Sequence, residues 1–219
     1  MSGSIYPAPS ELELVLAVIA VAAASYFLGC FNGAVIVSKY ILRDDIRDHG
    51  SGNAGLTNFH RTFGGGLTFV VILCDVLKAV IAVLLGSWLF SWAPVLGKYY
   101  AALFCLLGHM FPCMFHFKGG KGILSGGTVA LMIDWRIALV VWGGFLILTL
   151  LTRYVSLGSL WAGASFPFIS WYCYPRVPVV LLAFLLGGLV VWKHRGNAER
   201  LLHGTERKLS FRKKKEGGT

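Results

Sequence analysis

The residues best suited to chemistry in this sequence are the glycines and lysines of K-G-G-K-G at 118–122. Glycine lets a backbone approach a ligand closely and adopt a positive φ at little steric cost. Consecutive backbone N–H groups in such a turn form an anion-binding concavity, and the N-terminus of a following helix adds positive potential. The turn therefore predicts a phosphate site, although a basic loop that only fixes membrane topology has a similar composition. The candidate ligands are Lys118, Gly119, Gly120, Lys121 and Gly122.

A second glycine-rich segment, G-S-G-N-A-G-L-T-N at 50–58, precedes Arg61. Its spacing matches G-x-G-x-x-G, but a dinucleotide-binding turn needs a strand before it, and here R-D-D-I-R-D-H comes first. What remains is a turn rich in hydrogen-bonding groups, followed by an arginine that suits phosphate or a lipid headgroup. A solvated loop is the alternative. The candidate ligands are Ser51, Gly52, Asn53, Thr57, Asn58 and Arg61.

Three further residues are candidates for a supporting role inside the protein. Asp75 and Lys78 are three residues apart in an apolar run, so their side chains can pair on one helix. Charges within a membrane span are costly and face a protein interior or a pathway, which leaves a structural ion pair and a site role equally open. His109 follows a glycine near the end of another apolar run and is placed to orient the loop that follows.

Polar groups also follow the later apolar runs. Arg153 interrupts two such runs and is followed by Ser156. In the segment at 193–206, K-H-R-G-N-A-E-R-L-L-H-G-T-E, several polar residues recur at helical spacing and are expected to share one face. These residues are His194, Asn197, Arg200 and His203.

Covalent or metal-dependent catalysis is not indicated by these residues. No serine or cysteine lies in a G-x-S-x-G motif or beside an evident base. The five cysteines lie in or beside apolar runs without a C-x-x-C pair. His109, Cys113 and His116 have the spacing of a metal-binding helix face, but Pro112 interrupts that helix. We therefore expect no metal and no other cofactor.

Composition places these segments in a membrane. The chain has 219 residues, of which 56% are hydrophobic and 14% charged, with a mean hydropathy of +0.69. Soluble domains are about 25% charged. The net charge of +10 does not indicate nucleic-acid binding, because nine of the 20 Lys and Arg residues lie from Lys193 onward, beside the last apolar run. Basic residues in that position anchor a chain to acidic membrane lipid.

Seven apolar runs predict an all-α, polytopic integral membrane protein with about seven transmembrane helices. Sixteen Lys and Arg residues then lie on one side of the membrane and three on the other, with Lys78 inside a span. The positive-inside rule makes the richer side cytoplasmic and puts the N-terminus outside. Residues 1–210 form a single transmembrane domain, and 211–219 are a basic, disordered cytoplasmic tail. The runs are 12–41, 63–91, 99–115, 122–133, 137–152, 157–174 and 177–192.

Taken together, these motifs resemble the acyl-phosphate:glycerol-3-phosphate acyltransferases of bacterial membranes, the PlsY family. The similarity runs in one order from about residue 25 to residue 208 and is far more specific than any one motif. Its segments are G-S-G-N-A-G-L-T-N-F-H-R, D-x-x-K at 75–78, G-H-M-F-P-C-M-F-H-F-K-G-G-K-G, T-R-Y-V-S-L-G-S at 152–159, and the 193–206 segment.

The resemblance implies transfer of a fatty acyl group from acyl phosphate to the 1-hydroxyl of glycerol 3-phosphate, giving lysophosphatidate and phosphate. It implies an enzyme of the bacterial inner membrane whose active site faces the cytoplasm and whose partners are these two substrates and membrane lipid. An acyl phosphate is already activated, so positioning and charge stabilisation suffice without a covalent acyl-enzyme.

Residue roles also follow from the resemblance. Arg61, Lys121, Arg153 and His194 are expected to hold the phosphates and the developing oxyanion. The other residues expected to line the polar cavity are Ser51, Thr57, Asn58 and Asn197, with Gly119 and Gly120 shaping the phosphate-binding turn. The general base is either His194 or the phosphate of glycerol 3-phosphate itself.

A transporter of a phosphorylated solute is the main alternative, since buried charges within several helices would suit it. Against that reading, the polar motifs all lie on one face, whereas transporters bind near the membrane midplane between paired repeats. A purely structural subunit leaves the polar segments unexplained.

Overall fold

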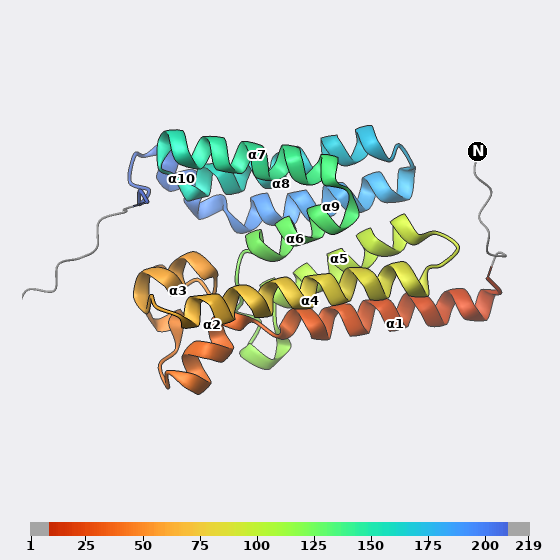
Figure 1. Cartoon of the computed structure of the whole chain (residues 1–219), viewed down its shortest axis with the longest axis horizontal. Coiled ribbons are helices and arrows are strands. Elements are labelled where there is room, and N and C mark those ends of the chain that lie inside the picture. Colours follow the sequence, from red (N-terminus) through yellow and green to blue (C-terminus); the bar gives the residue numbers. More distant parts are fainter. Residues whose placement is uncertain (1–8, 210–219) are drawn as a thin grey trace, which may run out of the picture.

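The computed structural model of the protein describes residues 9–209, and within them every regular element is a helix (Figure 1). This confirms the all-α prediction. The predicted tail at 211–219 lies outside the described residues. The long helices are α1 (Glu11–Cys30), α4 (Leu67–Leu89), α5 (Pro94–Met110), α6 (Ile123–Ile133), α7 (Trp135–Thr152), α8 (Val155–Cys173) and α9 (Val177–Lys193). The shorter ones are α2 (Gly33–Ile36), a π-helix (Val37–Ile41), a 3₁₀ turn (Ile46–Asp48), α3 (Leu56–Thr62), a 3₁₀ turn (Cys113–Phe115) and α10 (Arg195–Leu202).

The first predicted run, 12–41, is not one helix. α1 ends at Cys30, and Asn32 starts a new helix by accepting a hydrogen bond from the Val35 N–H at 3.1 Å. Asparagine is a favoured N-cap because its side-chain oxygen satisfies a free N–H of the first turn. The Asn32 amide also donates to the carbonyl of Ala54 at 3.0 Å, which ties this break to the glycine-rich segment at 50–58.

The start of α5 also differs from the prediction. The sequence suggested a turn at 91–98 and a helix from 99, but α5 begins at Pro94. Proline suits the first helical turn because its missing N–H would have no partner there. The same helix ends at Met110 rather than 115, two residues before Pro112, because proline disfavours helical geometry in the residue before it.

Membrane crossing is supported for part of the bundle. α1, α4 and α7 are long and apolar enough to span a bilayer, and α9 with α10, bent by 54° at their junction, would make a fourth. α6 has 11 residues, or about 16 Å of helix against a hydrocarbon core of about 30 Å. The structure therefore supports an integral membrane protein, while seven complete spans stay a prediction.

The helices form two groups, with α1, α4 and α5 on one side, α7, α8 and α9 on the other, and α6 between them (Figure 1). α4 and α5 meet at glycines: a Cβ on Gly86 would lie 2.3 Å from the Gly97 carbonyl oxygen. Such small-residue contacts are typical of membrane helices, which associate through close packing because lipid is as apolar as their side chains. α1 begins at one end of the bundle, and both α3 and α10 lie at the other end (Figure 1).

Candidate active site

An open cavity of about 1130 Å³ lies where α3, the turn before α6, the start of α8 and the α9–α10 junction meet. It gathers polar groups from segments far apart in the chain. Most of the residues predicted from sequence line it. These are Ser51, Gly52, Asn53, Thr57, Asn58, Arg61, Asp75, His109, Gly119, Lys121, Gly122, Ser156, His194 and Asn197.

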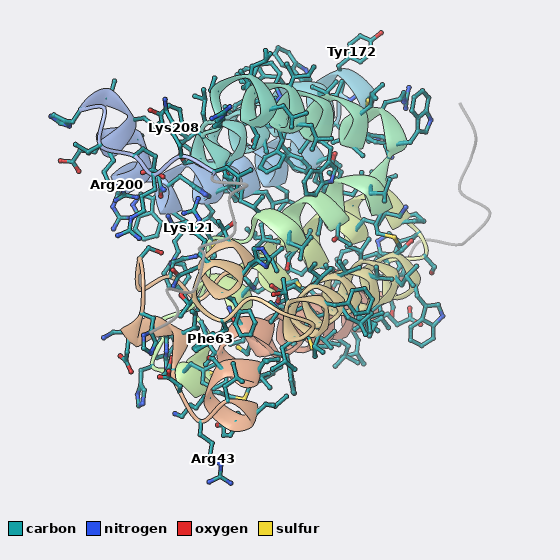
Figure 2. All side chains as sticks on the ribbon, turned by 60° about the vertical axis from the view of Figure 1, so that its left-hand side comes forward. Arg43, Phe63, Lys121, Tyr172, Arg200 and Lys208 are labelled. Carbon is teal, nitrogen blue, oxygen red and sulfur yellow. The ribbon has the colours of Figure 1, made fainter. Side chains whose placement is uncertain are left out.

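A chain of hydrogen bonds joins the K-G-G-K-G turn to α10. The ammonium of Lys121 donates to Oδ1 of Asn197, and Nδ2 of Asn197 donates to Oε1 of Glu206 at 2.8 Å. Arg200 donates to the other oxygen of that carboxylate at 2.7 Å. Lys121 and Arg200 lie on the same side of the molecule (Figure 2). The cavity wall therefore carries two cations and one carboxylate held at fixed positions.

Lys121 is the most perturbed cation of this group. Burial, followed by repulsion from Arg200, lowers the pKa of Lys121 to about 8. Removing an ammonium from water disfavours its charged form. Lys121 is thus charged at neutral pH, and an arriving anion that pairs with it would stabilise that charge.

Glu206 is a cavity residue that the sequence reasoning missed. Burial opposes its ionisation, but hydrogen bonds from Asn197 and Arg200 outweigh burial and lower the pKa of its carboxyl group. The sequence feature that could have identified Glu206 is its position as an acidic residue at the end of a strongly basic segment. Glu206 sits beyond α10, where the chain returns across the α7–α8 turn, and the Leu209 N–H donates to the Arg153 carbonyl at 2.7 Å. Arg207 and Lys193 also line the cavity.

His194 ends α9 with its ring buried and fixed. Its Nδ1 lies 2.8 Å from the Val190 carbonyl oxygen, which can only accept a hydrogen bond. Nδ1 therefore carries the proton, and Nε2 of the neutral ring has a free lone pair. His194 lines the cavity and can act there as a proton acceptor.

The K-G-G-K-G turn is built differently from the prediction. The N–H groups of Gly119 and Gly120 donate to the carbonyls of Met110 and His109, at 3.3 and 3.1 Å, so they close the end of α5 and do not face a ligand. Of the glycines in this turn, Gly122 alone has a positive φ, at +76°. Because the first N–H groups of a helix have no intrahelical acceptor, the N–H groups after Gly122 that start α6 are the donors suited to an anion.

Gly119 and Gly120 are needed for close packing. A Cβ on Gly119 would lie 2.1 Å from the His109 carbonyl oxygen, and one on Gly120 would lie 2.3 Å from His109 Nε2. Neither space admits a methyl group. Gly120 is buried and absent from the cavity lining, so it shapes the turn from behind.

Asn58 organises the segment at 50–58 from its centre. Its Oδ1 accepts the Ser51 N–H at 3.1 Å, and its Nδ2 lies within 3.0–3.3 Å of the carbonyls of Ile46, His49 and Asn53. These three carbonyls use both donor hydrogens of the amide. Asn58 therefore positions the loop, and the exposed Ser51 and Thr57 are the side chains available to a ligand.

Asp75, Lys78 and His109 form one buried polar cluster. Lys78 Nζ lies 2.7 Å from Asp75 Oδ1 and 2.7 Å from His109 Nδ1. It also donates to the Phe31 carbonyl at 3.0 Å, at the break between α1 and α2. The predicted pairing of Asp75 with Lys78 is confirmed. Since Lys78 does not line the cavity, its direct role is to join α1, α4 and α5 behind the K-G-G-K-G turn.

Two of the predicted phosphate ligands lie outside the lining of the cavity. Lys118 and Arg153 are exposed and do not line the cavity, so the structure does not bring them together with the other predicted ligands. Arg153 ends α7 in a left-handed conformation, with φ at +61°, and its carbonyl holds the returning C-terminal segment. Lys118 lies on the outer side of its turn, where its carbonyl oxygen is 3.5 Å from an Arg47 nitrogen.

The site therefore combines cations, a helix N-terminus and the proton acceptor His194 around an open cavity, beside apolar helices. Cations and N–H groups of this kind stabilise phosphates and the oxyanion that develops during acyl transfer. Within residues 9–209, no three His, Cys, Asp or Glu side chains gather as a metal site would require.

Known proteins are similar to this chain in sequence and in fold. Residues 19–204 match the family model described as glycerol-3-phosphate acyltransferase. A glycerol-3-phosphate acyltransferase of Thermoanaerobacter pseudethanolicus is 37% identical over 185 residues, covering 84% of this chain and 92% of the relative. One from Clostridioides difficile is 35% identical and covers 91% of this chain and 98% of the relative.

The solved structures agree with the sequence relatives. The chain superposes with a TM-score of 0.80 on the glycerol 3-phosphate form of PlsY, an integral membrane glycerol 3-phosphate acyltransferase, at 31% identity. That match covers 88% of this chain and 96% of the solved one. The lysophosphatidic acid form of PlsY gives a TM-score of 0.77.

Proposed function

The chain belongs to the glycerol-3-phosphate acyltransferase family, and we propose that it moves a fatty acyl group from acyl phosphate to the 1-hydroxyl of glycerol 3-phosphate. The products are lysophosphatidate and inorganic phosphate. The observation that carries this proposal is the cavity, where Lys121, Asn197 and Arg61 line the same space as the N-terminus of α6, beside apolar helices. Both substrates are phosphates, and PlsY relatives carry glycerol 3-phosphate or lysophosphatidic acid in their solved forms.

Cations from different segments of the chain line the cavity. Lys121 and Arg200 stand on the side of α10, and Arg61 stands on α3 beside the loop at 50–58. Two phosphates bound together repel each other, and several cations around one cavity offset that repulsion. The start of α6, after Gly122, supplies N–H groups near the same region.

The reaction needs no covalent acyl-enzyme. The hydroxyl oxygen of glycerol 3-phosphate attacks the acyl carbonyl carbon, the bond from that carbon to the phosphate oxygen breaks, and the electron pair leaves on phosphate. Lys121 and the α6 N-terminus stabilise the negative charge that develops. The hydroxyl proton passes either to Nε2 of His194 or to a phosphate oxygen of the substrate, and both acceptors are compatible with the cavity.

The protein acts in the bacterial inner membrane, with this cavity facing the cytoplasm and the start of α1 outside. The positive-inside charge pattern supports this orientation. It can be tested by placing single cysteines at the exposed Ser10 and His203 in a cysteine-free variant. An impermeant thiol reagent should label Ser10→Cys in whole cells and His203→Cys only after lysis. Labelling of both in whole cells would contradict the orientation.

The direct test of function uses purified protein in detergent, incubated with hexadecanoyl phosphate and glycerol 3-phosphate. We expect lysophosphatidate by mass spectrometry, in equal amount to the phosphate released. Hexadecanoyl-CoA in place of the acyl phosphate should give little product, since the site suits a small anionic leaving group. Equal rates with both donors would contradict the choice of donor. Uptake of glycerol 3-phosphate into vesicles without any lysophosphatidate would instead indicate a transporter.

Direct transfer predicts that no side chain becomes acylated. The intact mass of the protein, measured during turnover, should not increase by an acyl group. A variant with all five cysteines replaced should remain active, since none of them lines the cavity. An acylated side chain found on a kinetically competent time scale would overturn this mechanism.

A further inference from the structure

Most of the cations that line the polar cavity already have a partner in the protein. Six lysines and arginines line it, against three carboxylates. Four of the six donate to a carbonyl, an amide or a carboxylate of the chain, and these are Lys121, Lys193, Arg195 and Arg200. Within residues 9–209, the guanidinium groups of the other two, Arg61 and Arg207, have no hydrogen bond or ion pair. Both are therefore available to a ligand.

Arg61 and Arg207 lie close enough to repel each other. Partial desolvation at the cavity wall, followed by repulsion from Arg207, lowers the pKa of the Arg61 guanidinium, while attraction to Glu206 opposes this change. Repulsion between charges falls with distance and is screened by salt over about 10 Å, so the two guanidinium groups are neighbours in the cavity. A single anion bound between them would replace this repulsion with two attractive contacts.

The backbone holds Arg207 at the cavity from both sides. Before it, the Glu206 carboxylate accepts a hydrogen bond from Arg200 at 2.7 Å. After it, the Leu209 N–H donates to the Arg153 carbonyl at 2.7 Å. Arg61 is likewise held in place, near the end of α3. The two arginines thus face one space from separate, anchored segments, and each guanidinium presents a planar pair of N–H donors that matches two phosphate oxygens.

We propose that Arg207 and Arg61 together bind one phosphate group in this cavity. The inference rests on the proposed function for the identity of that group, which is the phosphate of glycerol 3-phosphate or that of the acyl phosphate donor. Arg207 is then a substrate-binding residue in addition to those predicted from sequence. A phosphate dianion suits the pair, because it can accept hydrogen bonds from both guanidinium groups and offset both charges.

The kinetic test compares wild type, Arg207→Gln, Arg207→Lys and the control Lys208→Gln in detergent. Lys208 is exposed, does not line the cavity and lies 5.4 Å from the centre of the Tyr154 ring, so its replacement removes a neighbouring charge outside the site. Arg207→Gln should raise KM for one substrate about tenfold, the low end for a hydrogen bond to a charged group, with kcat within about twofold. The substrate whose KM rises is the one whose phosphate the pair binds. Arg207→Lys should recover part of the loss, because it keeps the charge without the planar donors. Lys208→Gln should keep both KM values.

Thermal unfolding gives a second readout that needs no turnover. Without ligand, Arg207→Gln should melt no lower than wild type, because the substitution removes repulsion from Arg61. Glycerol 3-phosphate, or hexadecyl phosphate as a stable analogue of the donor, should then raise the melting temperature of Arg207→Gln less than that of Lys208→Gln. Weaker binding gives less stabilisation at the same ligand concentration.

The outcomes separate this inference from the function on which it rests. Unchanged KM values for both substrates in Arg207→Gln would overturn the arginine pair. So would a lower melting temperature without ligand combined with unchanged stabilisation by both ligands, since that result assigns Arg207 a structural role. An effect seen in vesicles of anionic lipid but absent in detergent would assign Arg207 to a lipid headgroup and also overturn the proposal. Absence of lysophosphatidate in the wild type would overturn the function instead. In that case, smaller stabilisation of Arg207→Gln than of Lys208→Gln by either ligand still supports the pair, and equal stabilisation rejects it.

Discussion

The two glycine-rich segments of this protein solve different structural problems. In 50–58, Gly50 and Gly52 take positive φ values of +61° and +68°, and the loop folds around the Asn58 amide. In 118–122, Gly119 and Gly120 have ordinary φ values but lie so close to His109 that a Cβ does not fit. Gly50 and Gly52 are therefore needed for backbone conformation, as is Gly122 with φ at +76°, whereas Gly119 and Gly120 are needed for contact. The two segments have similar compositions but should therefore respond differently to mutation.

Substitution in the contact segment should have the largest effect. Gly119→Ala forces either the turn or the end of α5 to move, because the new methyl would overlap a backbone oxygen. A shift of about 1 Å in a positioned catalytic group costs on the order of 100-fold in rate. We expect kcat/KM to fall by at least that factor, measured by lysophosphatidate formation on detergent-folded protein.

The control for Gly119→Ala is Gly65→Ala. Gly65 has φ at +66°, and a Cβ there meets nothing within 4 Å. This variant should lose about 1–2 kcal/mol of stability through left-handed strain and keep its activity. If Gly119→Ala is as active as Gly65→Ala, the contrast between contact and conformation is wrong.

Removal of the Lys121 charge should have the second-largest effect on kcat/KM. Lys121→Met removes a charge-assisted hydrogen bond to phosphate worth about 1.5–3 kcal/mol, so we expect a loss of about 10- to 100-fold in kcat/KM. Lys121→Arg keeps the charge and should recover part of the activity. Activity of Lys121→Met within the error of the wild type would move the phosphate site towards Arg61.

Raising the pH neutralises the same lysine and should have a smaller effect on activity than removing its side chain. With a pKa of about 8, Lys121 is protonated at pH 7 and mostly neutral at pH 9. Its depressed pKa thus means that phosphate binding is present below pH 8 and is lost as the pH rises. KM for glycerol 3-phosphate should increase about tenfold between these values. In Lys121→Arg the increase should disappear, and its persistence would assign the titration to another group.

The conformational segment should respond more mildly. Asn58→Asp keeps an acceptor for the Ser51 N–H but cannot donate to the carbonyls of Ile46, His49 and Asn53. Unsatisfied buried acceptors cost about 1–3 kcal/mol. We expect a lower melting temperature and a rise in KM of up to about tenfold, with kcat nearly unchanged. A selective loss of kcat would instead place Asn58 among the groups that contact the reacting atoms.

The smallest effect is expected at Lys118. Its side chain is exposed and outside the cavity lining, and exposed charges contribute about 0–1 kcal/mol. Lys118→Met should therefore have kcat/KM close to the wild type, in contrast to Lys121→Met three residues later. Equal losses in the two variants would mean that charge in the turn matters regardless of position.

The sequence alone determined the class of this protein and most of its parts. Apolar runs of helical length predicted the helices, because a lipid-facing helix must be apolar along its whole length. The order of five motifs predicted the family, and most of the polar residues predicted from them line one cavity. These features are local in sequence, so they could be read without a fold.

Tertiary structure decided how those parts are used. The Gly119 and Gly120 N–H groups close α5, Arg153 faces outward, and Glu206 enters the cavity, because each depends on partners far away in the chain. The break after α1 likewise depends on Lys78, 47 residues further along the chain than Phe31, whose carbonyl it binds. A sequence pattern shows which groups are available, but their hydrogen-bond partners, and hence what remains free for a ligand, are fixed only when distant segments pack together.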